Sequence, residues 1–134
     1  MADYLLVPAE PTSWVMGVDG FERRLLAAVP AASIWRSEDS ESPALLRFHV
    51  PWSEAGFTDG HLMRDRQTVE LNGGLDEAAV FALWLRSIVP VEQDLLLVDE
   101  GCHFAVVVRE GTTNADILDA ALTAAERLAD PSRG

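Results

Sequence analysis

Apolar runs closed by prolines or short polar turns predict seven β-strands along the chain. Three are single segments at about residues 4–7, 32–36 and 44–50, and the other four form two hairpins at 61–71 and 94–108. Apolar and polar residues alternate within 44–50. One face of that strand is therefore expected to meet the core and the other to meet solvent.

The first hairpin is predicted to turn at Asp65–Arg66, where charged residues interrupt the apolar pattern. A two-residue turn at this point places Leu62 opposite Val69, and His61 opposite Glu70. Because side chains alternate between faces, a slip of one residue in register would break both pairings. The pattern therefore predicts a specific register as well as a hairpin.

Apolar residues at helical spacing predict three helices, at about 19–29, 75–89 and 113–128. Each has, at or next to its start, a residue that can cap a helix N-terminus, and these residues are Asp19, Asp76 and Thr113. Thr113 has Asp116 three positions later, an arrangement typical of a capping box. The apolar stripe expected to face the core in the last helix consists of Leu118, Ala121, Leu122, Ala125 and Leu128.

The helix Leu75–Val89 carries an unbroken apolar run from Ala78 to Leu85. A helix that is apolar on all sides is buried on most of them. Two interpretations follow. The helix is the central core helix, or its additional apolar face forms a homodimer contact with a second copy of the chain.

The predicted order of elements is β-α-β-β-β-β-α-β-β-α. The middle strands are joined by short turns, which favours antiparallel pairing and hence an α+β fold with about six to seven strands and about three helices. A length of 134 residues fits one domain, so residues 1–134 are expected to form a single α+β domain with a frayed tail from about 130.

Charge narrows the classes of partner. The chain has 22 acidic and 10 basic residues, a formal net charge of −12, and all the basic residues are arginines. Such a charge repels nucleic acids and anionic membranes, and it favours a basic protein as partner. An acidic surface also serves solubility alone, so the charge does not by itself prove binding.

The compartment is predicted from cysteine usage and from the N-terminus. Cys102 is the single cysteine, which excludes an intrachain disulfide and fits a reducing cytoplasm. The first residues lack a basic segment followed by a long apolar core, so no signal peptide is predicted. The longest apolar stretch is too short to span a bilayer. We therefore expect a cytoplasmic protein.

The second hairpin carries the first group of candidate reactive residues. They lie in the stretch "DEGCHF" and are Asp99, Glu100, Cys102 and His103. A thiol nucleophile needs a base within hydrogen-bond reach, but neighbours on a strand point to opposite faces. The stretch is therefore predicted to be a three-residue turn in which Gly101 takes a positive φ.

The second group lies on the polar face of the middle strands. Arg47 and His49 share one side of the segment 44–50, and His61 is predicted to face Glu70. If the strands are neighbours, a histidine beside a carboxylate can act as a general base, and an arginine can hold an anion. The alternative is an ordinary solvated sheet face.

Trp52 opens a segment, 52–60, that is predicted to be a loop. A tryptophan exposed in a loop can anchor a partner or stack on a ligand, whereas one at the edge of the core only packs. Trp52 is therefore a candidate member of the partner face, with the core edge as the alternative.

A metal site and a cofactor are not predicted. The three histidines and Asp59 can ligate metals, but they lack the paired spacings that metal sites show. The sequence contains no G-x-G-x-x-G, no P-loop, no G-x-S-x-G and no C-x-x-C.

Two classes of function remain. The first is a non-catalytic protein-interaction domain, for which the acid excess and the apolar helix argue, as in inhibitor or immunity-type proteins. The second is a small enzyme or ligand-binding domain that uses the Arg47, His49, His61 and Glu70 face. The absence of a catalytic motif favours the first.

Overall fold

The computed structural model describes residues 3–52, 56–101 and 103–129. Its elements follow the predicted order. The strands are β1 (Tyr4–Pro8), β2 (Ser33–Arg36), β3 (Ala44–Pro51), β4 (Phe57–Met63), β5 (Val69–Asn72), β6 (Leu95–Asp99) and β7 (Ala105–Val108). The helices are α1 (Val18–Ala28), α2 (Leu75–Ile88) and α3 (Asn114–Ala129). The predicted α+β class is therefore confirmed.

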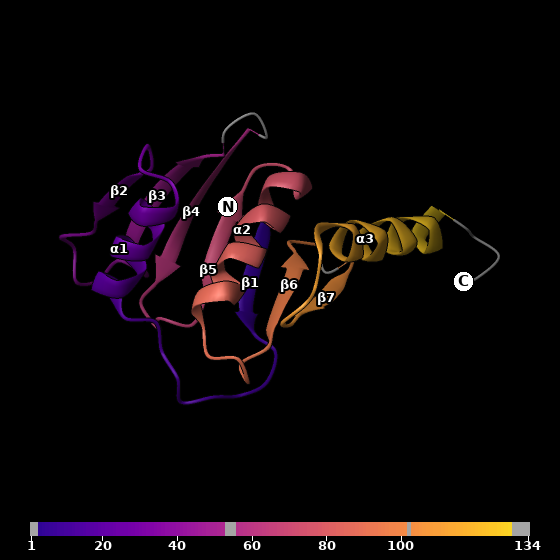
Figure 1. Ribbon diagram of the computed structural model, residues 1–134, viewed down its shortest axis with the longest axis horizontal. Coiled ribbons are helices and arrows are strands. Elements are labelled where there is room, and N and C mark those ends of the chain that lie inside the picture. The colour runs from indigo at the N-terminus through magenta and orange to yellow at the C-terminus, as the bar shows by residue number, and fades with distance from the viewer. Residues whose placement is uncertain (1–2, 53–55, 102, 130–134) are drawn as a thin grey trace.

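All seven strands form one antiparallel sheet, in the order β2-β3-β4-β5-β1-β6-β7 (Figure 1). The first strand of the chain lies inside this sheet, between β5 and β6. It therefore joins the run β2 to β5, where each strand pairs with the next in sequence, to the hairpin of β6 and β7. Local turns build each half, and β1 connects them by long-range pairing.

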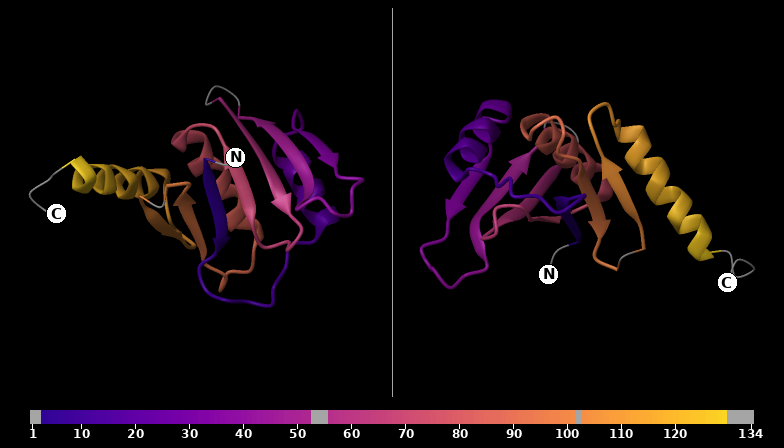
Figure 2. Two further views of the ribbon diagram at one scale, coloured as in Figure 1. Left: turned by 180° about the vertical axis from the view of Figure 1, so that it is seen from behind. Right: turned by 90° about the horizontal axis from the view of Figure 1, so that it is seen from below.

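The helices pack against one face of the sheet. Seen from behind, the strands lie in front of α1 and α2 (Figure 2, left). The buried core contains Phe21 and Leu25 from α1, Phe81 from α2 and Ile117 from α3. α3 packs beside β7 and α2 and extends away from the sheet (Figure 1). In the described part of the chain, no helix covers the opposite side, which we call the open face.

The centre of the core is a stack of aromatic rings. Phe48 of β3 and Phe81 of α2 lie parallel, with ring centroids 4.9 Å apart. Gly60 of β4 makes room for this arrangement, because an added Cβ would overlap the carbonyl oxygen of Glu70 and lie 2.6 Å from the Phe48 ring. A glycine in a strand often marks this kind of close approach.

α2 is the central core helix, as the first interpretation predicted. Its buried residues form one broad face of the helix and are Ala78, Ala79, Phe81, Ala82, Leu85 and Arg86. Val80, Leu83 and Trp84 are only half-buried. The alternative, a homodimer contact through Leu75–Val89, stays a prediction that light scattering can test.

Two predicted helix caps are wrong. α1 begins at Val18 after Gly17, and α2 begins at Leu75 after Gly74, with no side-chain cap at either. Asp19 and Asp76 lie instead inside the first helical turn, where a carboxylate still interacts favourably with the helix dipole. The N-cap residue is in each case the preceding glycine, Gly17 at φ −72° and Gly74 at φ −79°, in extended backbone conformation.

The third cap is confirmed. The Thr113 hydroxyl accepts a hydrogen bond from the Asp116 amide at 3.2 Å, and the Asp116 carboxylate accepts one from the Thr113 amide at 2.9 Å. The predicted apolar stripe of α3 is only partly inward. Leu118 and Ala121 are half-buried, whereas Leu122 is 59% exposed and Ala125 is exposed. The side chain of Leu128 lies outside the described residues.

The loop predicted over 52–60 is wrong in its second half. β4 begins at Phe57, and Pro51, Val50 and His49 of β3 pair with Phe57, Thr58 and Asp59. The sequence suggested a loop because Thr, Asp and Gly are frequent in turns. Pairing with β3 overrides that local preference, since Thr58 and Gly60 are buried on the core side.

Candidate functional site

The open face has a polar half that the strand register assembles. Arg47 of β3 pairs with His61 of β4, which pairs in turn with Glu70 of β5. The two predicted cross-strand pairs of the first hairpin, Leu62 with Val69 and His61 with Glu70, are confirmed. Side chains directly opposite on one face lie close together, so Arg47, His61 and Glu70 form one row across three strands.

A second row lies beside the first. Ser33 of β2 pairs with His49 of β3, and His49 pairs with Asp59 of β4. The Nδ1 atom of His49 lies 2.6 Å from a carboxylate oxygen of Asp59. This contact fixes the orientation of the imidazole ring. It uses Nδ1, so Nε2 is the ring nitrogen that Asp59 does not engage. Sequence reasoning missed the pair because it placed Asp59 in a loop. Extending the alternation of the strand back to Phe57 would have revealed it.

Aromatic side chains lie in and beside the polar half. Arg47 stacks on the Trp35 ring, with its guanidinium carbon 4.4 Å from the ring centroid. The Phe57 ring lies 5.1 Å from the His49 ring. Trp35 is 47% exposed and Phe57 is 51% exposed, high values for residues of this size. Both rings are therefore available for contact.

The other half of the open face is aliphatic. It consists of the β1, β6 and β7 residues whose neighbours in sequence are buried on the helix side, namely Leu5, Val7, Leu96, Val98 and Val107. Val7 pairs with Leu96, which pairs with Val107, while Leu5 pairs with Val98. The four central residues are half-buried, and Val107 is exposed. They form a continuous apolar surface next to the polar rows.

Trp52, the fifth candidate for this face, lies on the helix side instead. Its indole N–H donates to the Thr58 hydroxyl at 2.8 Å, and its ring meets Phe81 edge-on with centroids 6.5 Å apart. The Thr58 hydroxyl donates in turn to the Glu77 carbonyl at 3.1 Å. Trp52 therefore belongs to the edge of the core, the alternative that the sequence left open.

The hairpin of β6 and β7 has a longer turn than predicted. Val98 pairs with Ala105, so residues 99–104 lie between them, and Gly101 does not take a positive φ. The Asp99 carboxylate accepts a hydrogen bond from the Phe104 amide at 3.0 Å and lies 3.1 Å from His103 Nδ1.

The contacts of Asp99 with His103 and Phe104 close the longer turn, and a further contact ties this turn to the residue before β1. The Glu100 amide donates to the Asp3 carbonyl. Asp99, Glu100 and His103 therefore have structural contacts in the turn, and Cys102 lies outside the described residues. His103 is also distant from the polar rows, because β5, β1 and β6 separate β7 from β4.

Acidic residues gather at one end of the sheet. Burial, followed by the negative charges of Asp3, Asp99, Asp76 and Glu77, raises the pKa of the Tyr4 phenol. These carboxylates come from α2, from the end of β6 and from the residue just before β1. The negative potential of the chain is therefore strong around Tyr4, which packs against the core on the side of the sheet that α2 covers.

The described residues contain no group of three or more His, Cys, Asp or Glu side chains arranged to hold a metal ion. None of the helices in that part of the chain combines the length and apolar character needed to cross a membrane. Comparison of the chain with protein-family models, with curated proteins and with solved structures found no match. Function is therefore argued from the geometry of the site.

Proposed function

We propose that this chain is a protein-interaction domain that binds its partner through the open face of the sheet. The observation that carries the proposal is the aliphatic half of that face, Leu5, Val7, Leu96, Val98 and Val107, over which the described residues place no helix. A contiguous apolar surface is a feature of many protein interaction sites.

The open face also has the residues that dominate binding energies. Trp35 and Phe57 are large, exposed and next to the polar rows. Aromatic and arginine side chains supply most of the binding free energy at many interfaces. Burying one such ring contributes about 2 kcal/mol through its apolar area. We therefore expect Trp35, Phe57 and Arg47 to be the anchors of the complex.

The proposed partner is a protein with a basic surface. The net charge of −12 attracts positive charge over long range. The face itself has mixed charges in the row of Arg47, His61 and Glu70. Mixed charges add little attraction, but they oppose wrong registers of docking. A domain with this combination covers a basic partner surface, as an inhibitor does.

The test is a pull-down with tagged wild-type protein from its native lysate at about 50 mM and about 500 mM salt, read by mass spectrometry. We expect a stoichiometric partner at low salt and much less of it at high salt. The variant Trp35→Ala with Phe57→Ala should lose this partner. The control Leu122→Ala removes an equally exposed apolar side chain from α3 and should keep it.

Two outcomes contradict the proposal. Wild-type protein with no partner at either salt argues against an interaction domain. A partner that both variants retain argues against Trp35 and Phe57 as the anchors of the complex. Circular dichroism of both variants checks that the fold is kept.

A second function is supported by the contact between His49 and Asp59. A carboxylate 2.6 Å from His49 Nδ1 orients the ring, so that Nε2 can take a proton from a hydroxyl. Ser33 is the residue opposite His49 on β2. The row of Ser33, His49 and Asp59 therefore has the order of groups that activates a serine. However, the four cavities of about 370 to 580 Å³ are lined by other residues, so none of these four adjoins the row of Ser33, His49 and Asp59. This makes the second function the weaker candidate.

A fluorophosphonate probe separates this second function from the first. If His49 activates Ser33, the probe labels Ser33, and labelling falls at least about tenfold in His49→Gln and in Asp59→Asn. Absence of labelling in wild-type protein rejects the second function. The same result leaves the pull-down prediction unaffected.

A further inference from the structure

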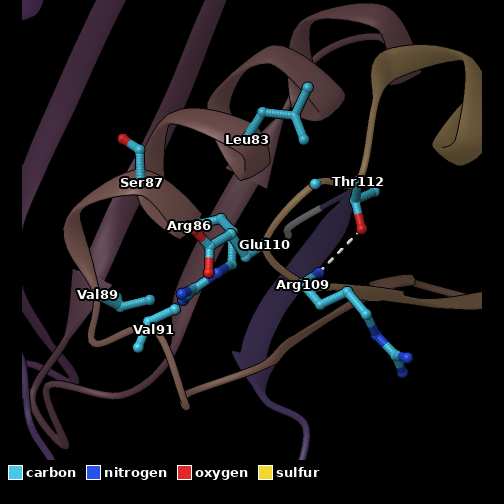
Figure 3. A pocket seen from close by; sticks show the side chains of 9 residues that line it. Leu83, Arg86, Ser87, Val89, Val91, Arg109, Glu110 and Thr112 are labelled. Carbon is cyan, nitrogen blue, oxygen red and sulfur yellow. Dashed lines mark hydrogen bonds between the residues drawn. The ribbon is translucent and has the colours of Figure 1, made fainter.

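A cavity of about 390 Å³ lies on the helix side of the molecule, away from the open face. It is formed by the second half of α2, the loop that follows it, and the turn that joins β7 to α3 (Figure 3). Leu83, Val89 and Val91 supply apolar walls, and Arg86, Glu110 and Thr112 supply polar groups. This volume and this mixture of groups are those of a small-molecule site.

Arg86 is the unusual residue of this cavity. Its side chain is in the last turn of α2 and is only 6% exposed. Two of its nitrogens donate to the carbonyls of Gln93 and Pro90, at 2.6 Å and 2.9 Å. Its Nε atom is buried and has no hydrogen-bond partner. None of the ion pairs among the described residues includes Arg86.

A buried guanidinium without an anion is costly. Carbonyl oxygens satisfy individual N–H groups, but they do not supply the full negative charge that an ion removed from water requires. Carboxylates complement arginine especially well, because two oxygens can accept from its planar fork. Among the described residues, no carboxylate lies within ion-pair distance of this buried charge, although Glu110 lines the same cavity.

We propose that this cavity binds a small carboxylate with a short aliphatic chain, whose carboxylate approaches Arg86 and whose chain contacts Val89 and Val91. The Thr112 hydroxyl already accepts a hydrogen bond from the Arg109 amide at 3.0 Å, which leaves its hydrogen to donate to the ligand (Figure 3). The Arg109 side chain points away from Arg86, so it is not part of the anion site (Figure 3).

Negative charge opposes the binding of this ligand in two ways, one local and one long-range. Glu110 lines the same cavity and is exposed, so its carboxylate competes with a bound anion. The net charge of −12 also repels anions over long range. At about 150 mM salt the screening length is about 8 Å, so the nearby Arg86 outweighs the distant charges.

The experiment is an NMR titration of the full chain with sodium hexanoate, compared with hexan-1-ol, at about 150 mM salt. Hexanoate should produce saturable shifts of the Leu83, Val89 and Val91 methyl groups and of the Thr112 amide. A dissociation constant of roughly 1 mM is expected for a ligand of this size. Hexan-1-ol has the same chain without the charge and should bind at least about tenfold more weakly.

Substitutions at the rim separate charge from shape without removing the buried arginine. Val91 is 60% exposed, so both Val91→Asp and Val91→Asn should fold. The two new side chains have nearly the same shape, and only the aspartate adds a negative charge. Val91→Asp should weaken hexanoate binding about tenfold relative to Val91→Asn, and Glu110→Gln should tighten it about threefold.

The proposal is overturned by any of three results: no saturable shifts with hexanoate, equal binding of hexan-1-ol, or equal binding to Val91→Asp and Val91→Asn. The last two results would mean that the cavity is only an apolar recess and that Arg86 serves to hold the loop at Pro90 and Gln93.

Discussion

At the scale of single residues, Gly60 links the polar open face to the aromatic core. It lies on β4 between Asp59 and His61, whose side chains are on the open face, and it provides the space that the Phe48 ring occupies on the other side. Packing inside proteins is dense, so such a position tolerates no added atom without movement of the strand or the ring. The geometry of the candidate site therefore depends on a residue without a side chain.

Gly60→Ala should lower the free energy of unfolding by about 2 to 3 kcal/mol, because the new methyl group forces Phe48 and the β5 backbone apart. Urea denaturation followed by tryptophan fluorescence measures the change. Gly20→Ala is the control, since no heavy atom lies within 4 Å of its added Cβ in α1. That variant should gain about 0.5 kcal/mol through helix propensity. Equal effects of the two variants would show that packing at Gly60 is unimportant.

At the scale of elements, the turn between β4 and β5 is held by one carboxylate. Asp65 accepts hydrogen bonds from the Gln67 amide at 2.9 Å, the Thr68 amide at 2.9 Å and the Thr68 hydroxyl at 2.7 Å. Burial acts to raise the pKa of Asp65, but these hydrogen bonds outweigh it and lower the pKa below its ordinary value of 3.8. The turn holds His61 and Glu70 in register.

Because the folded-state pKa of Asp65 is lowered, its charge stabilises the fold above the unfolded-state pKa, and this stabilisation is lost as pH falls through the folded-state pKa. Asp65→Asn should therefore cost about 0.5 kcal/mol at pH near 7 and close to nothing at pH near 2. Asp119→Asn, on the exposed side of α3, removes an equal charge as control. Urea denaturation at several pH values measures both. A pH-independent cost would contradict the assignment.

α3 is held by its N-terminal cap and by one buried side chain, and the predicted apolar stripe contributes less than expected because part of it is exposed. The reciprocal hydrogen bonds of Thr113 and Asp116 satisfy two amides that a helix start leaves free. Leu122, by contrast, is mostly in solvent. Ile117, which is fully buried, supplies the main inward contact.

Thr113→Ala should lower the free energy of unfolding by about 1 kcal/mol, because the helix start loses its hydroxyl acceptor. Leu122→Gln should change it by less than about 0.5 kcal/mol, since that side chain is already exposed. Thermal denaturation by circular dichroism compares the two. A larger loss from Leu122→Gln would instead indicate that another surface covers α3 in solution.

At the scale of the whole molecule, net charge acts on folding and on association in opposite ways. The 22 acidic residues repel one another within the folded chain, which lowers its stability at low salt. The same charges attract the proposed basic partner, and salt weakens that attraction. Salt should therefore stabilise the free protein and weaken the complex.

The Tm of the free protein should rise by several degrees between about 10 mM and about 300 mM sodium chloride, as screening reduces the internal repulsion. Differential scanning calorimetry measures this change. A Tm that is constant or falls would mean that pairs such as Arg36 with Asp19 and Glu22, at 2.6 Å and 2.7 Å, outweigh the net repulsion.

Part of the candidate site could be predicted from the sequence because it depends on one hairpin. The pairing of His61 with Glu70 follows from a short turn and the two-residue period of a strand. The contact between His49 and Asp59 could not be predicted in the same way. It requires β4 to extend back to Phe57, and only pairing with β3 shows that extension.

The sequence by itself determined the order of the ten elements, the α+β class, the register of the first hairpin and the cap at Thr113, because each depends on periodicity or on contacts within a few residues. Only the tertiary structure decided that β1 lies between β5 and β6, that Asp59 lies beside His49, and that Arg86 is buried beside a cavity. These features depend on contacts between residues in different parts of the fold. Local patterns do not encode them, because many strand orders bury the same apolar residues equally well.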